Sequence, residues 1–147
     1  MLRTSGGTPL TTVLGMARYV IDAPTVLHVV TEGLTVSPEH KLVAPSLVRS
    51  QALSLLFEAV RRGELSEEEA LVQHTRFTEL KMRLLGDRVS RATAWRIAAE
   101  QGWDSTYDAE YFAVTRLQAD AFVTIDPTMA ARAAGVVPVA PLEALTE

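Results

Sequence analysis

The chain has 147 residues, a formal net charge of −4 at pH 7 and no cysteine. Its length suits one domain with one core, and its 48% hydrophobic and 22% charged residues indicate a folded chain rather than a disordered one. The acidic balance argues against a broadly basic nucleic-acid binder. A nuclease stays open, because carboxylates that hold a metal ion add negative charge themselves.

The missing cysteines exclude disulfides, thiolate metal sites and a cysteine nucleophile, and they fit a cytoplasmic protein. No apolar run approaches the roughly 18 residues that span a bilayer, so we expect no membrane association. The first 17 residues contain one arginine and a weak apolar stretch broken by Gly and Pro, which is unlike a secretory signal. We expect residues 1–17 to be an N-terminal extension, which is either disordered or lies upstream of the true start near Met16. We expect residues 18–147 to form the domain.

Apolar, β-branched runs alternate with helical patterns along the rest of the chain. The predicted strands cover residues 18–22, 41–44, 80–85, 121–125 and 136–139. The predicted helices cover residues 25–31, 47–62, 67–78, 89–101, 106–118 and 127–134, with a final turn at 141–145. This alternation predicts an α/β fold, a three-layer α/β/α sandwich around a mainly parallel sheet of four to five strands.

Start signals support several of these helices. Ser46 and Ser105 are expected N-caps, and Ser66 with Glu69 matches a capping box. Pro138 interrupts the last predicted strand, which indicates an edge position because proline cannot donate to a sheet ladder.

Two predicted strands end in the same way, in an aspartate followed by a helix that proline initiates. The segments are YVIDAP at Asp22 and VTIDPT at Asp126. Functional groups gather beyond the carboxyl ends of parallel strands, and a third acid, Asp108 in STYDAEY, begins the helix at 106–118. We therefore expect these three carboxylates to meet there and to bind Mg²⁺ or Mn²⁺, which prefer hard oxygen ligands. The competing interpretation is that each aspartate only caps or begins a helix.

The segments that contain these acids resemble the PIN-domain ribonucleases of VapC toxins. The resemblance runs from about Arg18 to the C-terminus, through RYVIDAPTVLHVV, LVAPSLVRSQALSLLFEAVRRGEL and STYDAEYFAVTRLQADAFVTID. YDAEYFAV followed by FVTID is its most specific part.

The resemblance implies an α/β/α sandwich whose acidic pocket holds Mg²⁺ or Mn²⁺, and a homodimer that cleaves RNA until a VapB-like antitoxin blocks the pocket. It would make Asp22, Asp108 and Asp126 the first, third and fourth acids of the family. Thr124 would be the hydroxyl residue that lines the pocket two positions before the last acid.

This chain differs from the family at the position of the second acid. Six residues beyond Pro45, where the family usually has Glu, stands Gln51. Glutamine keeps a carbonyl oxygen but has no negative charge, so metal affinity and water activation should fall. Glu58 lies two turns further along the helix and is expected to be too far away to replace it.

Asp104 precedes the helix of Asp108 and could supply an oxygen, whereas Glu110 should point away from that aspartate. Arg49 and Lys41 are expected near the pocket edge, either contacting phosphate or as solvated charges. Leu53, Leu56 and Phe57 fit a dimer face or the core equally well. The three histidines match no metal spacing.

Two functions from different classes follow. One is a toxin-type, metal-dependent endoribonuclease with Gln51 as a weakened fourth member. The other is a catalytically impaired PIN-like module that acts by binding RNA or protein. Three explanations fit Gln51 itself: a natural variation that retains activity, a natural loss of catalysis, or an engineered change that lets a toxic protein be produced. A receiver-like domain ranks last, because it needs a late lysine and none follows Lys81.

Overall fold

The computed structural model describes residues 16–147, so the predicted extension falls almost entirely outside the described residues. Its last residue, Ala17, is buried, and its carbonyl accepts a hydrogen bond of 2.9 Å from the amide of Lys41. Ala17 therefore belongs to the packed domain, one residue earlier than expected.

A single four-stranded parallel sheet forms the centre of the molecule, with the strand order β3-β2-β1-β4. The strands are β1 (Arg18–Ile21), β2 (Lys41–Pro45), β3 (Arg83–Leu85) and β4 (Ala121–Val123). The parallel sheet is thus confirmed. Its two central strands, β1 and β2, contain Val20, Ile21 and Val43, which are buried β-branched residues as expected for a sheet covered on both faces.

The predicted fifth strand, residues 136–139, does not form as a strand. Its predicted edge position is confirmed, because the segment lies beside β4 at the edge of the sheet. Residues 136–139 make one isolated parallel bridge, between Val139 and Phe122 of β4. The amide of Phe122 donates to the carbonyl of Pro138 at 2.9 Å, and the amide of Ala140 donates back to Phe122 at 3.0 Å. Since Pro138 has no N–H, pairing goes no further.

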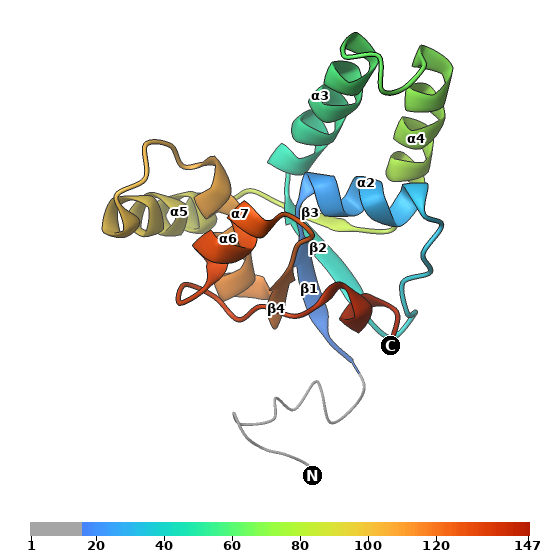
Figure 1. Ribbon diagram of the computed structural model, residues 1–147. Coiled ribbons are helices and arrows are strands. Elements are labelled where there is room, and N and C mark those ends of the chain that lie inside the picture. The colour runs from blue at the N-terminus through green and yellow to red at the C-terminus, as the bar shows by residue number, and fades with distance from the viewer. Residues whose placement is uncertain (1–15) are drawn as a thin grey trace.

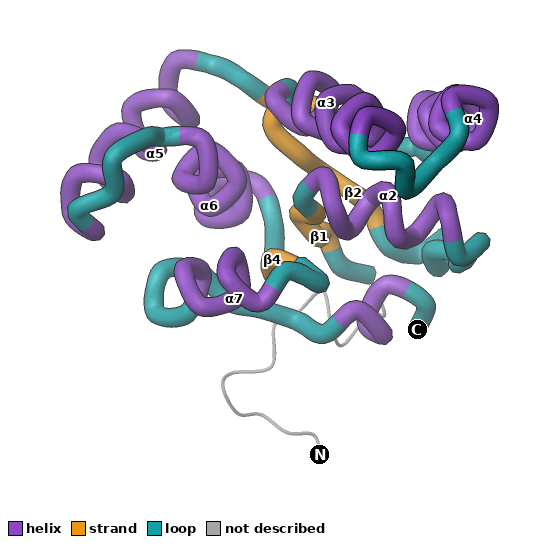
Figure 2. The backbone as a smooth tube through the Cα atoms, turned by 45° about the horizontal axis from the view of Figure 1, so that its top comes forward, coloured by secondary structure: helices purple, strands orange, loops and turns teal. Residues whose placement is uncertain are grey.

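Helices cover both faces of the sheet, which confirms the three-layer sandwich (Figures 1 and 2). The helices are α2 (Ala23–Thr31), α3 (Leu47–Arg61), α4 (Glu67–Glu79), α5 (Arg88–Gln101), α6 (Tyr107–Gln118), α7 (Pro127–Ala133) and the short 3₁₀ helix η1 (Leu142–Leu145). Helix α6 packs on one face, with α5 outside it, and α2 packs on the other, against α3 and α4. None of the described helices has the length and apolar character needed to cross a membrane.

Of the predicted helix N-caps, the capping box is confirmed and the two single serines are not. Ser66 and Glu69 form the predicted capping box, with both hydrogen bonds at 3.0 Å. Ser46 makes no side-chain cap bond because its backbone is already helical, and Thr106, not Ser105, precedes α6. The N-cap of α5 is Asp87, which was not predicted and which accepts from the amide of Ser90 at 2.8 Å.

An aromatic cluster fixes α6 on the sheet. The rings of Phe112 and Phe122 meet edge to face with centroids 5.3 Å apart, and Trp103 stacks at a tilt on Phe112 at 5.7 Å. Phe112 and Phe122 are fully buried, so truncating either to alanine should cost about 3–5 kcal/mol. The neighbouring residue, Tyr111, reaches from this core into the pocket described next.

Candidate functional site

A pocket of about 260 Å³ lies at the carboxyl ends of β1 and β4, where α2 and α7 begin. Its lining includes all three predicted aspartates, Asp22, Asp108 and Asp126, together with Gln51. Four residues from distant parts of the chain thus share one cavity. They meet because parallel strands deliver their carboxyl ends to a single edge of the sheet.

Asp22 is the most buried of these acids, with 2% of its surface exposed. Its Oδ1 accepts from the amide of Thr25, at 3.3 Å, and from the Thr25 hydroxyl, while its Oδ2 accepts from the Thr124 hydroxyl at 2.7 Å. Burial raises the pKa of Asp22 above its ordinary value, and the negative charge of Asp126 raises it further, although the hydrogen bonds oppose the shift. A cation in the pocket would favour the ionised form.

Asp126 caps α7 in the same manner. Its Oδ1 accepts from the amide of Thr128 at 2.9 Å, and its own amide donates to the Thr124 hydroxyl at 3.0 Å. Asp22 and Asp126 are therefore both N-caps, which confirms the capping role that the competing interpretation expected. Both also line the pocket, so the capping role does not exclude a functional one. Thr124 bridges them through its hydroxyl, but it is absent from the described lining of the pocket, where it was predicted.

Asp108 begins α6 and is held by Arg132 of α7. The Arg132 guanidinium donates to Oδ2 of Asp108 at 2.9 Å, and its central carbon lies 4.8 Å from the centroid of the Trp103 ring. The two charged side chains are 39% and 32% exposed, so water screens the ion pair. Arg132 was not among the residues selected from the sequence, because the pairing joins two helices that are distant in the chain.

Gln51 contacts a second residue that the sequence analysis missed. The Tyr111 hydroxyl donates to Oε1 of Gln51. Burial and the nearby charges of Asp22, Asp108 and Glu110 raise the pKa of Tyr111, so the phenol keeps its proton and remains a donor. Tyr111 lies three residues after Asp108 on one helix, a spacing that brings side chains to the same face, and that spacing could have indicated it.

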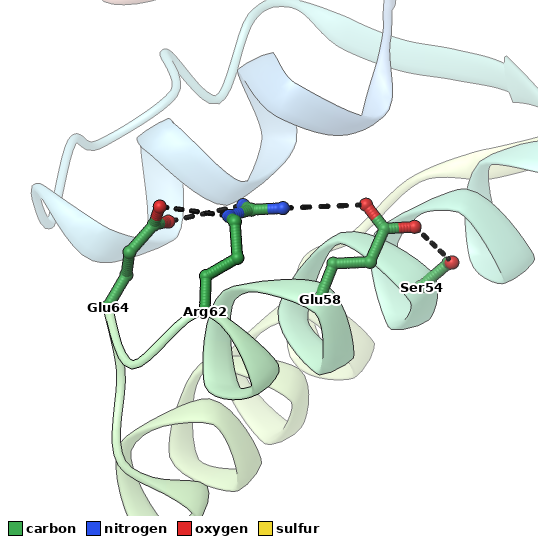
Figure 3. A network of polar contacts seen from close by, with 4 residues as sticks. All are labelled: Ser54, Glu58, Arg62 and Glu64. Atoms are coloured by element: carbon green, nitrogen blue, oxygen red, sulfur yellow. Dashed lines mark hydrogen bonds and ion pairs between the residues drawn. The ribbon is translucent and has the colours of Figure 1, made fainter.

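Glu58 lies closer to the site than the sequence suggested, since it lines the same pocket as Gln51. Figure 3 shows its contacts: its Oε2 accepts from the Ser54 hydroxyl at 3.0 Å, and its Oε1 lies 3.9 Å from Arg62. Arg62 in turn makes a two-pronged contact with Glu64, at 2.9 and 3.1 Å. Gln51 and Glu58, two turns apart on α3, thus line the same pocket.

Other predicted residues lie elsewhere. Among the described residues, Arg49 and Asp104 are absent from the lining of this pocket. Glu110 lines a separate small pocket with Arg91, and burial raises its pKa while Arg91 lowers it. Lys41 is at the opposite end of the sheet.

The predicted dimer face divides between the core and the surface. Leu56 is buried, whereas Leu53 is 54% and Phe57 65% exposed on α3. Only the last two are available to a partner.

The donor chemistry of the pocket fits a hard divalent cation, because its polar groups are carboxylate, amide and hydroxyl oxygens. The arrangement is not a ready metal cage: within residues 16–147, no three His, Cys, Asp or Glu side chains are grouped closely enough to hold an ion. Arg132 engages Oδ2 of Asp108. A metal at that oxygen would compete with the ion pair.

The fold has a counterpart among solved structures. The crystal structure of PAE2754 from Pyrobaculum aerophilum aligns with a TM-score of 0.66 over 89% of this chain and 95% of that one, at 19% sequence identity. At this identity the likeness shows the α/β/α fold alone. No protein-family model matches the sequence, and a comparison with curated proteins finds no match.

Proposed function

We propose that this protein is a metal-dependent endoribonuclease, the toxin component of a toxin–antitoxin pair. The observation that carries the proposal is the shared pocket of Asp22, Asp108 and Asp126 at the carboxyl edge of a parallel sheet. The resemblance of the surrounding segments to PIN-domain ribonucleases supplies the reaction class.

Mg²⁺ or Mn²⁺, when bound, would activate water and stabilise the leaving oxygen in an in-line displacement at phosphorus. Asp22 and Asp126 would hold the ion from two helix N-termini, and Asp108 would join them after leaving Arg132. Thr124 positions Asp22 through its 2.7 Å hydrogen bond. Arg132, once released, would offer its guanidinium to an RNA phosphate.

Glu58 is our candidate for the missing fourth carboxylate. It lines the pocket beside Gln51, and its contact to Arg62 is long, at 3.9 Å. Gln51 would contribute only a neutral carbonyl oxygen, which already accepts from Tyr111. Glu58 would orient the metal's water from the rim.

The proposed partners are RNA, a VapB-like antitoxin and a second copy of the chain, in the cytoplasm. Support for a protein partner comes from Leu53 and Phe57, which lie one turn apart and expose their apolar side chains on α3.

The test is cleavage of a labelled RNA pool with Mg²⁺ or Mn²⁺ by the unchanged protein, Asp22→Asn and Gln51→Glu. Asp104→Asn is the control, because Asp104 is an exposed acid just before α6, the helix of Asp108, and does not line the pocket. Cleavage that Asp22→Asn loses and Asp104→Asn keeps would support the proposal. Cleavage that survives Asp22→Asn would refute it.

The second candidate is an impaired PIN-like module that binds RNA or protein without cutting. The Asp108–Arg132 ion pair and the neutral Gln51 favour it, because both reduce the charge available to a metal. Activity that appears only in Gln51→Glu would select this function. Calorimetric titration with Mn²⁺ separates the two independently of any RNA, since the impaired module should bind the ion weakly or not at all.

A further inference from the structure

A second, larger pocket lies at the opposite end of the sheet, where β2 and β3 begin. Its volume is about 620 Å³, within the range of roughly 300–1,000 Å³ that is typical of small-molecule sites. Among residues 16–147, it shares no lining residue with the aspartate pocket. A small ligand bound here is therefore separate from the proposed metal.

The charged residues of this pocket are all cationic: Arg18, Lys41, Lys81 and Arg83. Lys41 and Lys81 are the only two lysines of the whole chain. Within residues 16–147, neither lysine nor Arg83 forms an ion pair. A chain with net charge −4 thus gathers four cations here, and two of them, Arg18 and Lys41, also line an adjoining pocket with the carboxylates of Glu39 and Asp120.

Sheet register explains how three of these cations come together. Arg18 of β1 pairs with Lys41 of β2, and Val43, two residues on, pairs with Arg83 of β3. Residues that pair across strands, and those two apart on a strand, point to the same face. Arg18, Lys41 and Arg83 therefore project from one face of the sheet.

Helix dipoles do not neutralise this charge. The lining includes Leu80 and Gln118, where α4 and α6 end. Each helix C-terminus carries roughly half a negative charge, so two of them offset about one of the four cations. The remaining potential is positive and favours an anion.

The rest of the lining is mainly apolar. It is formed by Val36, Leu42, Leu80, Met82 and Leu85. The His40 ring adds a polar wall, edge-on to Tyr19 at 5.2 Å. His40 Nδ1 is the buried side-chain nitrogen that has no hydrogen-bond partner among residues 16–147.

We propose that this pocket binds a small organic anion with an apolar body, whose carboxylate or phosphate head lies among Lys41, Lys81 and Arg83. The charged rim recognises the head and the aliphatic wall takes the body, the division typical of ligand pockets. A purely ionic ligand would leave the apolar wall in water, and a neutral one would leave the cations without a counter-ion.

The two lysines make the test direct. The full-length protein is acylated with a limiting amine reagent, and modification of each lysine is read by peptide mass spectrometry. Octanoate and octyl phosphate, compared in parallel, distinguish a carboxylate from a phosphate head. Octan-1-ol has the tail without the charge, and inorganic phosphate has the charge without the tail. We expect one or both anionic amphiphiles to protect Lys41 and Lys81 together, and octan-1-ol and phosphate to protect neither.

Calorimetric titration of the preferred amphiphile supplies a second measurement. Lys41→Gln and Lys81→Gln should each weaken binding about tenfold, as expected for loss of a charge-assisted contact. Arg61→Gln and Arg88→Gln, which remove exposed cations elsewhere, should leave it unchanged. Equal binding by all four variants, or protection by inorganic phosphate alone, would overturn the proposal. Protection by single-stranded RNA without protection by either amphiphile would also overturn it and assign the cations to nucleic acid.

Discussion

The two ends of the sheet carry opposite charge. At the carboxyl ends of the strands, Asp22, Asp108 and Asp126 line one pocket, whereas both lysines and two arginines line the pocket at the amino ends. Net charge conceals this separation, since the chain as a whole has only −4. The contrast teaches that in a parallel α/β fold the position of a charge along the strands tells more about function than its sum.

Helix direction supplies a physical reason for the difference. Helices α2 and α7 begin at the acidic pocket, where their N-termini favour carboxylates, and Asp22 and Asp126 cap them. Helices α4 and α6 end at the basic pocket, where C-termini favour cations. Each pocket thus has helix dipoles that favour its charge, although burial outweighs them at Asp22 and raises its pKa, and each proposed ligand has the sign opposite to the charge of its pocket.

The largest expected effect is a crossed loss of function between the two ends. Asp22→Asn should lower RNA cleavage about 100-fold or more, because it removes a metal-binding charge, and should leave octanoate binding unchanged. The Lys41→Gln, Lys81→Gln double variant should do the reverse. Cleavage rates and calorimetric titration on the same samples measure both. If either variant impaired both properties, the two pockets would not be independent.

A carboxylate at position 51 should strengthen the acidic end. Gln51→Glu adds a negative charge beside Tyr111, whose hydroxyl can still donate to it, so we expect Mn²⁺ to bind about tenfold more tightly. Gln51→Leu is the control that removes the oxygen altogether. Titration with Mn²⁺ followed by calorimetry or by electron paramagnetic resonance measures the change, and equal affinity in all three proteins would exclude Gln51 from the site.

Stability should depend on pH through Asp22. Its pKa is raised above 3.8 in the folded protein, so folding favours the protonated carboxyl. The stability that Asp22 contributes is therefore fully present below the pKa of this carboxyl in the unfolded chain. It is lost as pH rises through the raised pKa of the folded protein. Asp22→Asn, which does not titrate, should be the more stable protein at pH 7, and the gap should close toward pH 4.

Urea unfolding at several pH values measures that gap. Added Mg²⁺ should stabilise the unchanged protein and leave Asp22→Asn unaffected, since only the former offers the carboxylate. A gap that widened as pH fell would contradict the assigned direction of the pKa shift.

The smallest expected effect concerns Arg132. Arg132→Gln should lower the free energy of unfolding by less than about 1 kcal/mol, because the ion pair with Asp108 is partly exposed. It should also free Asp108 and tighten Mn²⁺ binding about threefold, within the range of a screened ion pair. Thermal unfolding and Mn²⁺ titration provide the two measurements. Weaker Mn²⁺ binding would show that Arg132 supports the site instead of competing for it.

Much of the acidic pocket could be predicted because its signals are local. A buried apolar run that ends in Asp and Pro determines where a strand stops and a helix begins, and this placed Asp22 and Asp126 at one edge of the sheet. The capping box at Ser66 is equally local. The alternation of strands and helices predicted the layers for the same reason: each segment carries its own periodicity.

Only the tertiary structure decided which side chains meet. Arg132 contacts Asp108 across 24 residues of sequence, and Tyr111 contacts Gln51 across 60. The position of Glu58 at the pocket depends on the packing of α3 against α2. The lysine pocket depends on the register that aligns β1, β2 and β3. Residues 136–139 show the same limit, since a β-like sequence gained only one bridge beside Phe122. Local sequence fixes backbone direction over a few residues, whereas packing and register are properties of the whole assembled core.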